Sequence, residues 1–428
     1  MRDKIVRLKN SKFLKSISIL TTGSVIAQII TVVASPLITR LFSPADIGIY
    51  TYILSLANIF NAAMNGRYDL AIVSEEKQER VFPLIKLSFL FSVAMSAAVS
   101  TGYFIYFKFF SKEYADYPYI PVLIFVLLMS FGLINILTSF NNRNKEYFVM
   151  SSVYVIRTAS QNIGAVIGGL LKAGMPGLLL PYVLGQFLGI NRQAKMLKPH
   201  LKEVVKVSKE EMKEVMKIHY KQPLFSAPAQ LLSGLSYSSV TLFIKALFNT
   251  SVVGYYSISM RVLGLPLSVI SGNVSKVFFA DASREYDKTG QFYNSFKKTA
   301  LFLVALSIPM VLGMFFIVPP LCRPIFGEGW EVAGTYIRIL SFMFGFRFIT
   351  TSLTPGLIVA NKQNYDLPFQ VALVAIALGC YIVAKTFNLS MEEFLILISA
   401  FFSLRFFSYF LFIGRLSKKK GEIKNETD

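Results

Sequence analysis

Long apolar segments, separated by short polar ones, dominate the pattern of side chains along this chain. Pro121–Phe140 contains no charged residue, and neither does Ser88–Phe107. About 20 apolar residues in helical conformation are enough to cross the hydrocarbon core of a bilayer. The pattern therefore predicts an all-α polytopic membrane protein and excludes a soluble fold.

Twelve segments have the length and apolarity expected of transmembrane helices. Six lie in each half of the chain, and a polar stretch separates the halves. We expect spans at Ile17–Phe42, Ile47–Val73, Val81–Phe107, Pro118–Phe140, Tyr147–Leu171, Met175–Asn191, Pro223–Phe248, Val252–Ala280, Thr299–Val318, Val332–Ala360, Leu367–Phe387 and Met391–Ile413.

Composition agrees with this assignment, because hydrophobic residues make up 54% of the chain and charged residues only 16%. The net charge of +20 would suggest nucleic acid as the partner of a soluble protein. In a membrane protein it mainly reports topology, since Lys and Arg concentrate in cytoplasmic segments. With both termini in the cytoplasm, the outer loops hold few basic residues: Lys108, Lys112, Lys172, Arg323 and Lys385.

The chain is expected to divide into three parts. Residues 1–193 form an N-terminal six-helix bundle, 194–222 a cytoplasmic basic linker, and 223–428 a C-terminal six-helix bundle with a basic tail. The linker follows helical spacing from Leu201 to Met216 and has a separate lysine-rich face, which predicts an amphipathic helix on the inner leaflet. A simple tether is the plainer interpretation, and a regulatory or docking helix is the alternative.

The two halves resemble each other in sequence. Leu41–Tyr50 aligns with Leu247–Tyr256, with Leu, Phe, Gly and Tyr at matching places. Because each half holds an even number of spans, the repeats insert in the same orientation. Transporters built from such repeats hold their substrate at the repeat interface.

Charged residues inside the spans are the candidate functional groups. Each costs roughly 2.5–3.5 kcal/mol to insert, so each needs water, a partner or a ligand. The ten basic ones are Arg40, Arg67, Lys86, Arg157, Lys245, Arg261, Lys276, Arg338, Arg347 and Arg405, against one clear acid, Asp69.

Depth in the membrane sorts these cations. Arg157, Arg261 and Arg347 lie near mid-span, while Arg40 and Lys245 lie near the outer ends. The planar guanidinium group matches phosphate, so the excess of cations predicts an anionic, phosphorylated cargo. A structural contact with backbone carbonyls is the alternative for the mid-span arginines.

The inner end of the second span carries the cluster Gly66-Arg67-Tyr68-Asp69. It is interpreted either as a gate or cargo contact or as a local Arg–Asp pair. Asp69, Arg67 and Lys276 are the candidates for gating or ion coupling, although Lys276 sits where it could simply reach the interface.

No cofactor or metal is expected. His200 and His219 have no metal-ligand spacing and are expected at the surface, and there is no phosphate-binding loop of the Walker type. The two cysteines, Cys322 and Cys380, are expected to be free thiols.

Three segments resemble one known family. The runs Pro36–Tyr50 and Gly66–Val73, with Asn142-Arg143-Asn144-Lys145, are similar to the corresponding parts of Wzx-type polysaccharide flippases of the MOP superfamily. The resemblance implies two six-helix bundles in a V, with spans one, two, seven and eight lining a central cleft. Arg40, Arg67, Asp69, Lys245, Arg261 and Lys276 belong to these spans. Arg157 and Arg347 would have to point inward from peripheral spans.

The resemblance also implies a function. Such proteins move undecaprenyl-pyrophosphate-linked oligosaccharides from the cytoplasmic to the outer leaflet of the bacterial plasma membrane, for O-antigen, capsule or exopolysaccharide. The partners implied are this lipid-linked glycan, membrane lipids, and the polymerase and chain-length proteins of the same pathway. A multidrug exporter of the same superfamily is the alternative. An enzyme is disfavoured, because a glycan polymerase would need a large outer loop.

Overall fold

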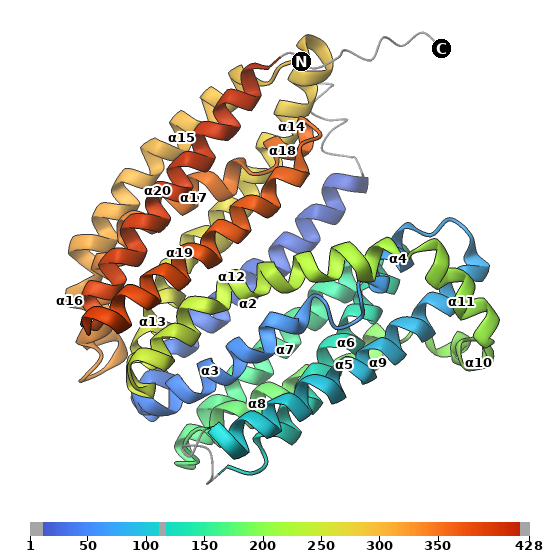
Figure 1. Ribbon diagram of the computed structural model, residues 1–428, viewed down its shortest axis with the longest axis horizontal. Coiled ribbons are helices and arrows are strands. Elements are labelled where there is room, and N and C mark those ends of the chain that lie inside the picture. Colours follow the sequence, from blue (N-terminus) through green and yellow to red (C-terminus); the bar gives the residue numbers. More distant parts are fainter. Residues whose placement is uncertain (1–11, 111–116, 420–428) are drawn as a thin grey trace. The chain divides into compact units, whose positions relative to one another are not determined.

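The computed structural model describes residues 12–110 and 117–419, and these ranges are helical with no strand (Figure 1). Within them, eight helical runs are long and apolar enough to cross a membrane. They are Ile19–Leu41, Gln78–Phe109, Ile120–Arg143, Thr250–Thr289, Tyr293–Phe326, Glu331–Val359, Gln363–Phe387 and Met391–Lys418. The prediction of an all-α integral membrane protein is confirmed.

The other four predicted spans fall on helices that are less apolar, shorter or interrupted. The second span coincides with α3 (Pro44–Asn61) and α4 (Tyr68–Ser74). The fifth coincides with α7 (Tyr147–Leu170), and the sixth with α8 (Pro176–Phe187) and α9 (Ile190–Gln193). The seventh begins with a π-helical turn, Gln222–Ser226, and continues as α12 (Ala227–Leu247). All twelve predicted spans thus coincide with helices.

The chain forms two compact units. Unit 1 comprises the chain up to Phe42 and Ile53–Ser238, and unit 2 comprises Ser43–Tyr52 and the chain from Ser239 onward. Two helices therefore pass from one unit to the other: the first turns of α3 belong to unit 2, and the first half of α12 belongs to unit 1. The predicted division at residues 193 and 222 stays a prediction.

The remaining helices of unit 1 are α2 (Lys12–Leu41), α5 (Val81–Phe110), α6 (Ile120–Arg143), α10 (Leu201–Lys206) and α11 (Lys209–Ile218). Those of unit 2 are α13 (Thr250–Pro266), α14 (Gly272–Thr289), α15 (Tyr293–Leu312), α16 (Val318–Phe326), α17 (Glu331–Leu353), α18 (Gly356–Val359), α19 (Asp366–Phe387) and α20 (Met391–Lys418). Two π-helical turns, Leu267–Ser271 and Gly313–Ile317, join α13 to α14 and α15 to α16.

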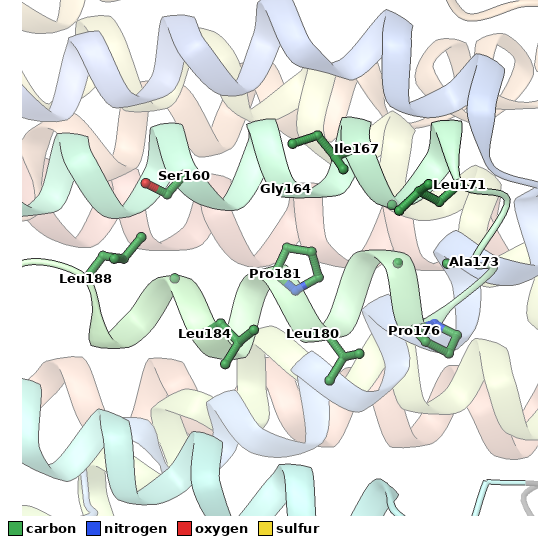
Figure 2. Close-up of a pocket in the computed structure, with 13 residues that line it drawn as sticks. Ser160, Gly164, Ile167, Leu171, Ala173, Pro176, Leu180, Pro181, Leu184 and Leu188 are labelled. Carbon is green, nitrogen blue, oxygen red and sulfur yellow. The ribbon is translucent and has the colours of Figure 1, made fainter.

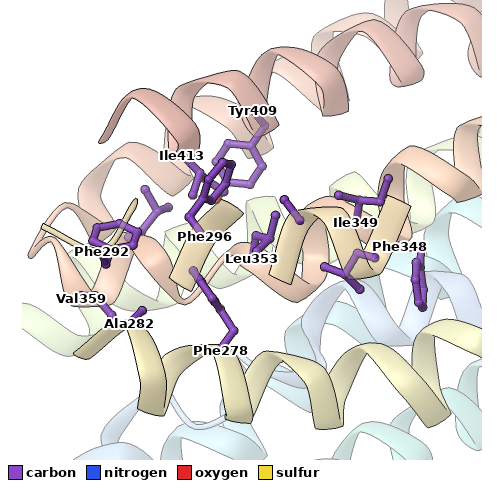
Figure 3. Packing of buried hydrophobic residues seen from close by; sticks show 13 residues of the cluster. Phe278, Ala282, Phe292, Phe296, Phe348, Ile349, Leu353, Val359, Tyr409 and Ile413 are labelled. Atoms are coloured by element: carbon purple, nitrogen blue, oxygen red, sulfur yellow. The ribbon is translucent and has the colours of Figure 1, made fainter. Parts of the chain in front are cut away.

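Aromatic side chains build the core of unit 2. Phe278, Phe292 and Phe348 are fully buried, and they pack with residues of α15 and α20 (Figure 3). The rings of Phe278 and Phe292 meet edge to face, with centroids 6.3 Å apart. Large rings bury more area than aliphatic side chains and lock into specific geometries. This cluster fixes the ends of α14, α15 and α20 that lie near one another.

The basic linker docks on unit 1 and forms two helices instead of one. A capping box at Ser208 begins α11, directly after α10 has ended at Lys206. Val215 of α11 is buried in the core formed by α4, α5 and α6, and Val204 of α10 packs against it. The prediction of a single helix is therefore wrong, and part of the apolar face is covered by protein. The position of the linker on the inner leaflet stays a prediction.

A close crossing in unit 2 joins the segment Ser43–Tyr52 to α13. A Cβ atom placed on Gly48 would lie 1.7 Å from the carbonyl oxygen of Thr250. A Cβ placed on Gly254 would lie 2.0 Å from the carbonyl oxygen of Pro44. Only glycine permits this approach of one backbone to the other.

The crossing is reciprocal between equivalent positions of the sequence repeat. The hydroxyl of Thr51 donates to that of Ser257 at 3.0 Å, across a separation of 206 residues, and the same separation relates Gly48 to Gly254. The helices also begin alike, since Ser43 and Asn249 cap α3 and α13 through side-chain oxygens. Equivalent positions of the predicted repeat therefore contact one another, and the duplication itself stays a prediction.

Candidate functional site

The second predicted span is broken inside unit 1. Between α3 and α4, residues 62–67 form a turn in which Gly66 and Arg67 both have left-handed backbone conformations, with φ of 58° and 62°. Irregular backbone at membrane depth is tolerated only where it is buried in protein or lines a wet cavity. Interrupted helices are also where membrane transporters place ligands. The break is therefore a candidate functional feature.

Side chains of unit 1 satisfy the backbone groups that the break exposes. Arg67 Nη1 donates to the Ala62 carbonyl at 3.1 Å, and Asn135 Nδ2 donates to the Asn61 carbonyl at 2.9 Å. Asn65 Nδ2 donates to two carbonyls, at 3.3 and 3.1 Å. These bonds make the break a fixed part of the fold.

The cluster Gly66–Asp69 lies at this break. Asp69 is 5% exposed in the first turn of α4, and Arg67 interacts with it electrostatically. Asp69 Oδ1 and Arg67 Nε are both buried without a hydrogen-bond partner. The predicted Arg–Asp pairing thus leaves buried donor and acceptor capacity unused on both residues.

Arg157 and Arg405 have structural partners. Arg157 is buried; its Nε donates to the Leu188 carbonyl at 3.1 Å and its Nη2 to Gln193 Oε1 at 2.8 Å. Arg405 donates twice to the Phe369 carbonyl, at 3.1 and 2.9 Å. These contacts favour the backbone-carbonyl alternative for both, and the hydrogen bonds of Arg157 account for its burial without a substrate.

Two other cations of the predicted set also contact main-chain oxygens. Lys86 Nζ donates to the carbonyls of Val205 and Val207, at 2.8 and 2.7 Å, which holds the end of α10 on α5. Arg338 Nε donates to the Phe315 carbonyl at 3.3 Å. Lys86 thus has partners within the protein.

Arg261 and Arg347 are placed differently. Both are half-buried on helices of unit 2 that pack together, α13 and α17. Arg261 is within electrostatic range of Tyr50, and Arg347 within range of Tyr256, the repeat equivalent of Tyr50. The Arg347 guanidinium also lies 5.3 Å from the Phe344 ring centre. Whether these two mid-span cations bind an anionic ligand stays a prediction.

The remaining predicted residues lie at helix ends. Arg40 is exposed in the last turn of α2, and Lys245 is half-buried in the last turn of α12. Lys276 is exposed in the first turn and a half of α14. Whether they contact substrate stays a prediction.

Sequence reasoning missed a polar contact between the linker and the end of α4. His219 Nε2 lies 2.8 Å from Glu75 Oε2, and both side chains are largely buried, so the expectation that His219 is a surface residue is wrong. Burial acts to raise the pKa of Glu75, but hydrogen bonds from the Lys77 N–H and from His219 outweigh it and hold that pKa below its ordinary value. Arg80 pairs with Glu214 of α11 at 2.9 Å nearby.

An apolar groove of about 460 Å³ runs between α7 and α8 in unit 1 (Figure 2). Its walls include Ile167, Leu180 and Leu184, and its floor is formed where glycines bring the helices together. A Cβ on Gly164 would lie 2.6 Å from Pro181 Cβ. Only Ser160 places a side-chain hydroxyl in the lining, so the groove suits hydrocarbon.

Solved structures share this fold. The inward closed conformation of the lipid II flippase MurJ superposes with a TM-score of 0.71 at 14% identity, covering 92% of this chain and 90% of that one. An inward-facing multidrug resistance MATE family transporter of the MOP superfamily gives 0.64 at 13% identity, covering 96% and 100%. The fold is therefore that of MOP-superfamily membrane transporters.

Sequence comparison then gives the family. A family model described as "Polysaccharide biosynthesis protein" matches residues 37–335, and the chain belongs to this family. It is also 27% identical over 159 residues to an "Uncharacterized membrane protein in cps region" of Klebsiella pneumoniae. That match covers 36% of this chain and spans about a third, 33%, of the relative's length. The resemblance to polysaccharide flippases is confirmed at the level of family and fold.

Proposed function

We propose that this protein translocates polyprenyl-pyrophosphate-linked oligosaccharide repeat units across the bacterial plasma membrane, from the cytoplasmic to the outer leaflet. Alternating access of the two repeats would expose the carrier to each side in turn, with both termini in the cytoplasm. The chain would act as a transporter and not as an enzyme. The lipid-linked glycan would be its cargo, and the polymerase of the same pathway would receive the product.

One observation carries the proposal: in a polysaccharide biosynthesis family, two mid-span arginines are half-buried on helices α13 and α17, which pack together. Arg261 and Arg347 are half-buried, whereas Arg157 and Arg405 are buried against main-chain oxygens. A guanidinium group can donate two parallel hydrogen bonds to a phosphate. A pyrophosphate is thus a suitable counter-ion for the half-buried pair, with Arg40, Arg67 and Lys245 as further contacts.

The experiment is deletion of the gene followed by measurement of the leaflet that holds the lipid-linked oligosaccharide. We expect the intermediate to accumulate on the cytoplasmic leaflet and surface glycan to disappear. Complementation with Arg261→Ala should fail, and Arg261→Lys should restore transport only in part, because an ammonium group cannot form the bidentate contact.

Arg284→Ala is the matched control. Arg284 is an exposed arginine of α14 whose ion pair with Asp281, at 3.7 Å, is a surface contact of small energetic value. Normal leaflet distribution in the deletion strain would overturn the proposal. Drug sensitivity with intact glycan would favour an exporter instead.

A further inference from the structure

Three buried serines of α5 lack the hydrogen bond that helical serines of this chain usually make. Ser88, Ser92 and Ser96 are fully buried, and their hydroxyl oxygens have no partner. By contrast, Ser35 and Ser130 each donate at 2.6 Å to a carbonyl of their own helix. Because the three serines recur every four residues, they lie on one face of α5 on consecutive turns.

Asn65, in the break of the second span, adds a further oxygen to this row. Its Nδ2 donates to the carbonyls of Ser88 and Gly132, which fixes the orientation of the amide. Its Oδ1 is therefore left buried without a partner. A Cβ on Gly132 would lie 1.5 Å from Ser92 Oγ, so the hydroxyl of Ser92 occupies the space that this glycine leaves on α6.

Asp69 lies on a helix that packs against α5, the helix that carries the three serines. It lies four residues after Asn65, on α4, which packs against α5 and α6, and its Oδ1 is buried and unpartnered. Arg67 is the charged group that acts on it from the preceding turn. From α6, Arg143 bonds to carbonyls at the far end of α4, and the π-helical turn Gln222–Ser226 that also touches α4 carries no charge.

The distance between successive serine hydroxyls on α5 is close to the distance that one bridging water spans. Four helical residues rise about 6 Å, which is too far for direct contact between successive hydroxyls. Two hydrogen bonds of about 2.8 Å through one water span nearly the same length. Buried polar groups without a protein partner are rare, and internal waters are what usually satisfy them.

We propose that the α5 hydroxyls and Asn65 hold a chain of internal waters through which protons reach the Asp69 carboxylate. A proton passed along this chain adds to the carboxylate and gives a neutral carboxylic acid, and it leaves by the same route. The inference rests on the proposed function, for which such proton exchange would supply the coupling step.

The test is infrared spectroscopy of the full-length protein in lipid vesicles, titrated with acid and without substrate. Several carboxylic acid C=O bands will grow on acidification, because the chain has 24 Asp and Glu residues. We expect one of these bands to be absent in Asp69→Asn. The rate at which the band follows a pH jump should fall about tenfold in Ser92→Ala and Ser96→Ala, the factor for one lost hydrogen bond of ordinary strength. Ser130→Ala, which removes a buried hydroxyl with a partner on its own helix, should leave the rate unchanged.

Each other outcome overturns the inference. A spectrum of Asp69→Asn identical to that of the wild type would show that Asp69 does not titrate. An unchanged rate in both serine variants would remove the water path. A change of the band with Na⁺ at constant pH, absent in Asp69→Asn, would indicate a cation site instead. Since no readout requires translocation, normal leaflet distribution in the deletion strain would overturn only the proposed function.

Discussion

Gly254→Ala tests the close crossing of α13 with the segment Ser43–Tyr52. The new methyl group would lie 2.0 Å from the Pro44 carbonyl oxygen and 2.8 Å from its carbon. Both are backbone atoms, so no side-chain rotation relieves the clash and the helices must separate by about 1 Å. Overpacking of this kind costs about 1–3 kcal/mol, against a gain of about 1 kcal/mol from replacing glycine inside a helix. A net loss of up to about 2 kcal/mol is expected.

Gly264→Ala is the matched control, because Gly264 lies on the same helix with no atom within 4 Å of the position of a Cβ. Here only the gain in helix propensity applies, and stability should rise by up to about 1 kcal/mol. The assay can use the two buried thiols of unit 2, Cys322 and Cys380, which become accessible to a thiol-reactive fluorophore on unfolding. The apparent midpoint should fall by up to roughly 4–8 °C in Gly254→Ala at a fixed scan rate.

The close approach at Gly48 and Gly254 is reciprocal, and a second prediction follows from it. Once Gly254→Ala has separated the helices, Gly48→Ala should cost less stability than it does alone. The double variant should therefore lose less stability than the two single variants lose in sum. Equal midpoints for Gly254→Ala and Gly264→Ala would refute the reasoning, since they would mean that the two backbones are not in close contact.

Two further predictions concern polar contacts of unit 1. Arg157→Met should lower stability by about 1–3 kcal/mol, because it leaves the Leu188 carbonyl and Gln193 without their donor; translocation should then fall only in proportion to the amount of folded protein, as immunoblotting of membranes would show. Glu75→Gln should lower stability at neutral pH. The folded pKa of Glu75 lies below its unfolded value of about 4.3, so the ionised carboxylate stabilises the fold above that pH and this contribution is lost as pH falls. The wild-type midpoint should therefore decline more steeply below pH 4.3 than that of Glu75→Gln, and parallel curves would refute the assignment.

The hydrophobic pattern and the internal repetition were enough to predict the fold, because both can be recognised from residues that are close together in the sequence. The segments Leu41–Tyr50 and Leu247–Tyr256 align through the two glycines that later proved to be in contact with the opposite segment. The break after Asn61 was not predicted, since no proline interrupts the segment and a single glycine such as Gly66 is tolerated inside a helix. Its stabilising bonds come from other helices, such as that of Asn135.

The roles of the charged residues depended on partners distant in sequence. Glu75 and His219 are 144 residues apart, and nothing near either residue indicates the other. Arg157 was expected as a substrate contact because its depth matches that of Arg261, yet its donors reach a carbonyl at the end of α8. The depth of an arginine in the membrane can be predicted from the sequence, whereas the hydrogen-bond acceptor nearest to its guanidinium group cannot.

The placement of Ser43–Tyr52 in unit 2 has a consequence for how the chain is made. This segment is synthesised early, but its partners on α13 follow 206 residues later, as the Thr51–Ser257 bond shows. At about 5–20 residues per second, the ribosome needs roughly 10–40 s to supply them. During that interval the glycine face of α3 has no native neighbour, so a nascent chain released before α13 should be recognised and degraded as unassembled.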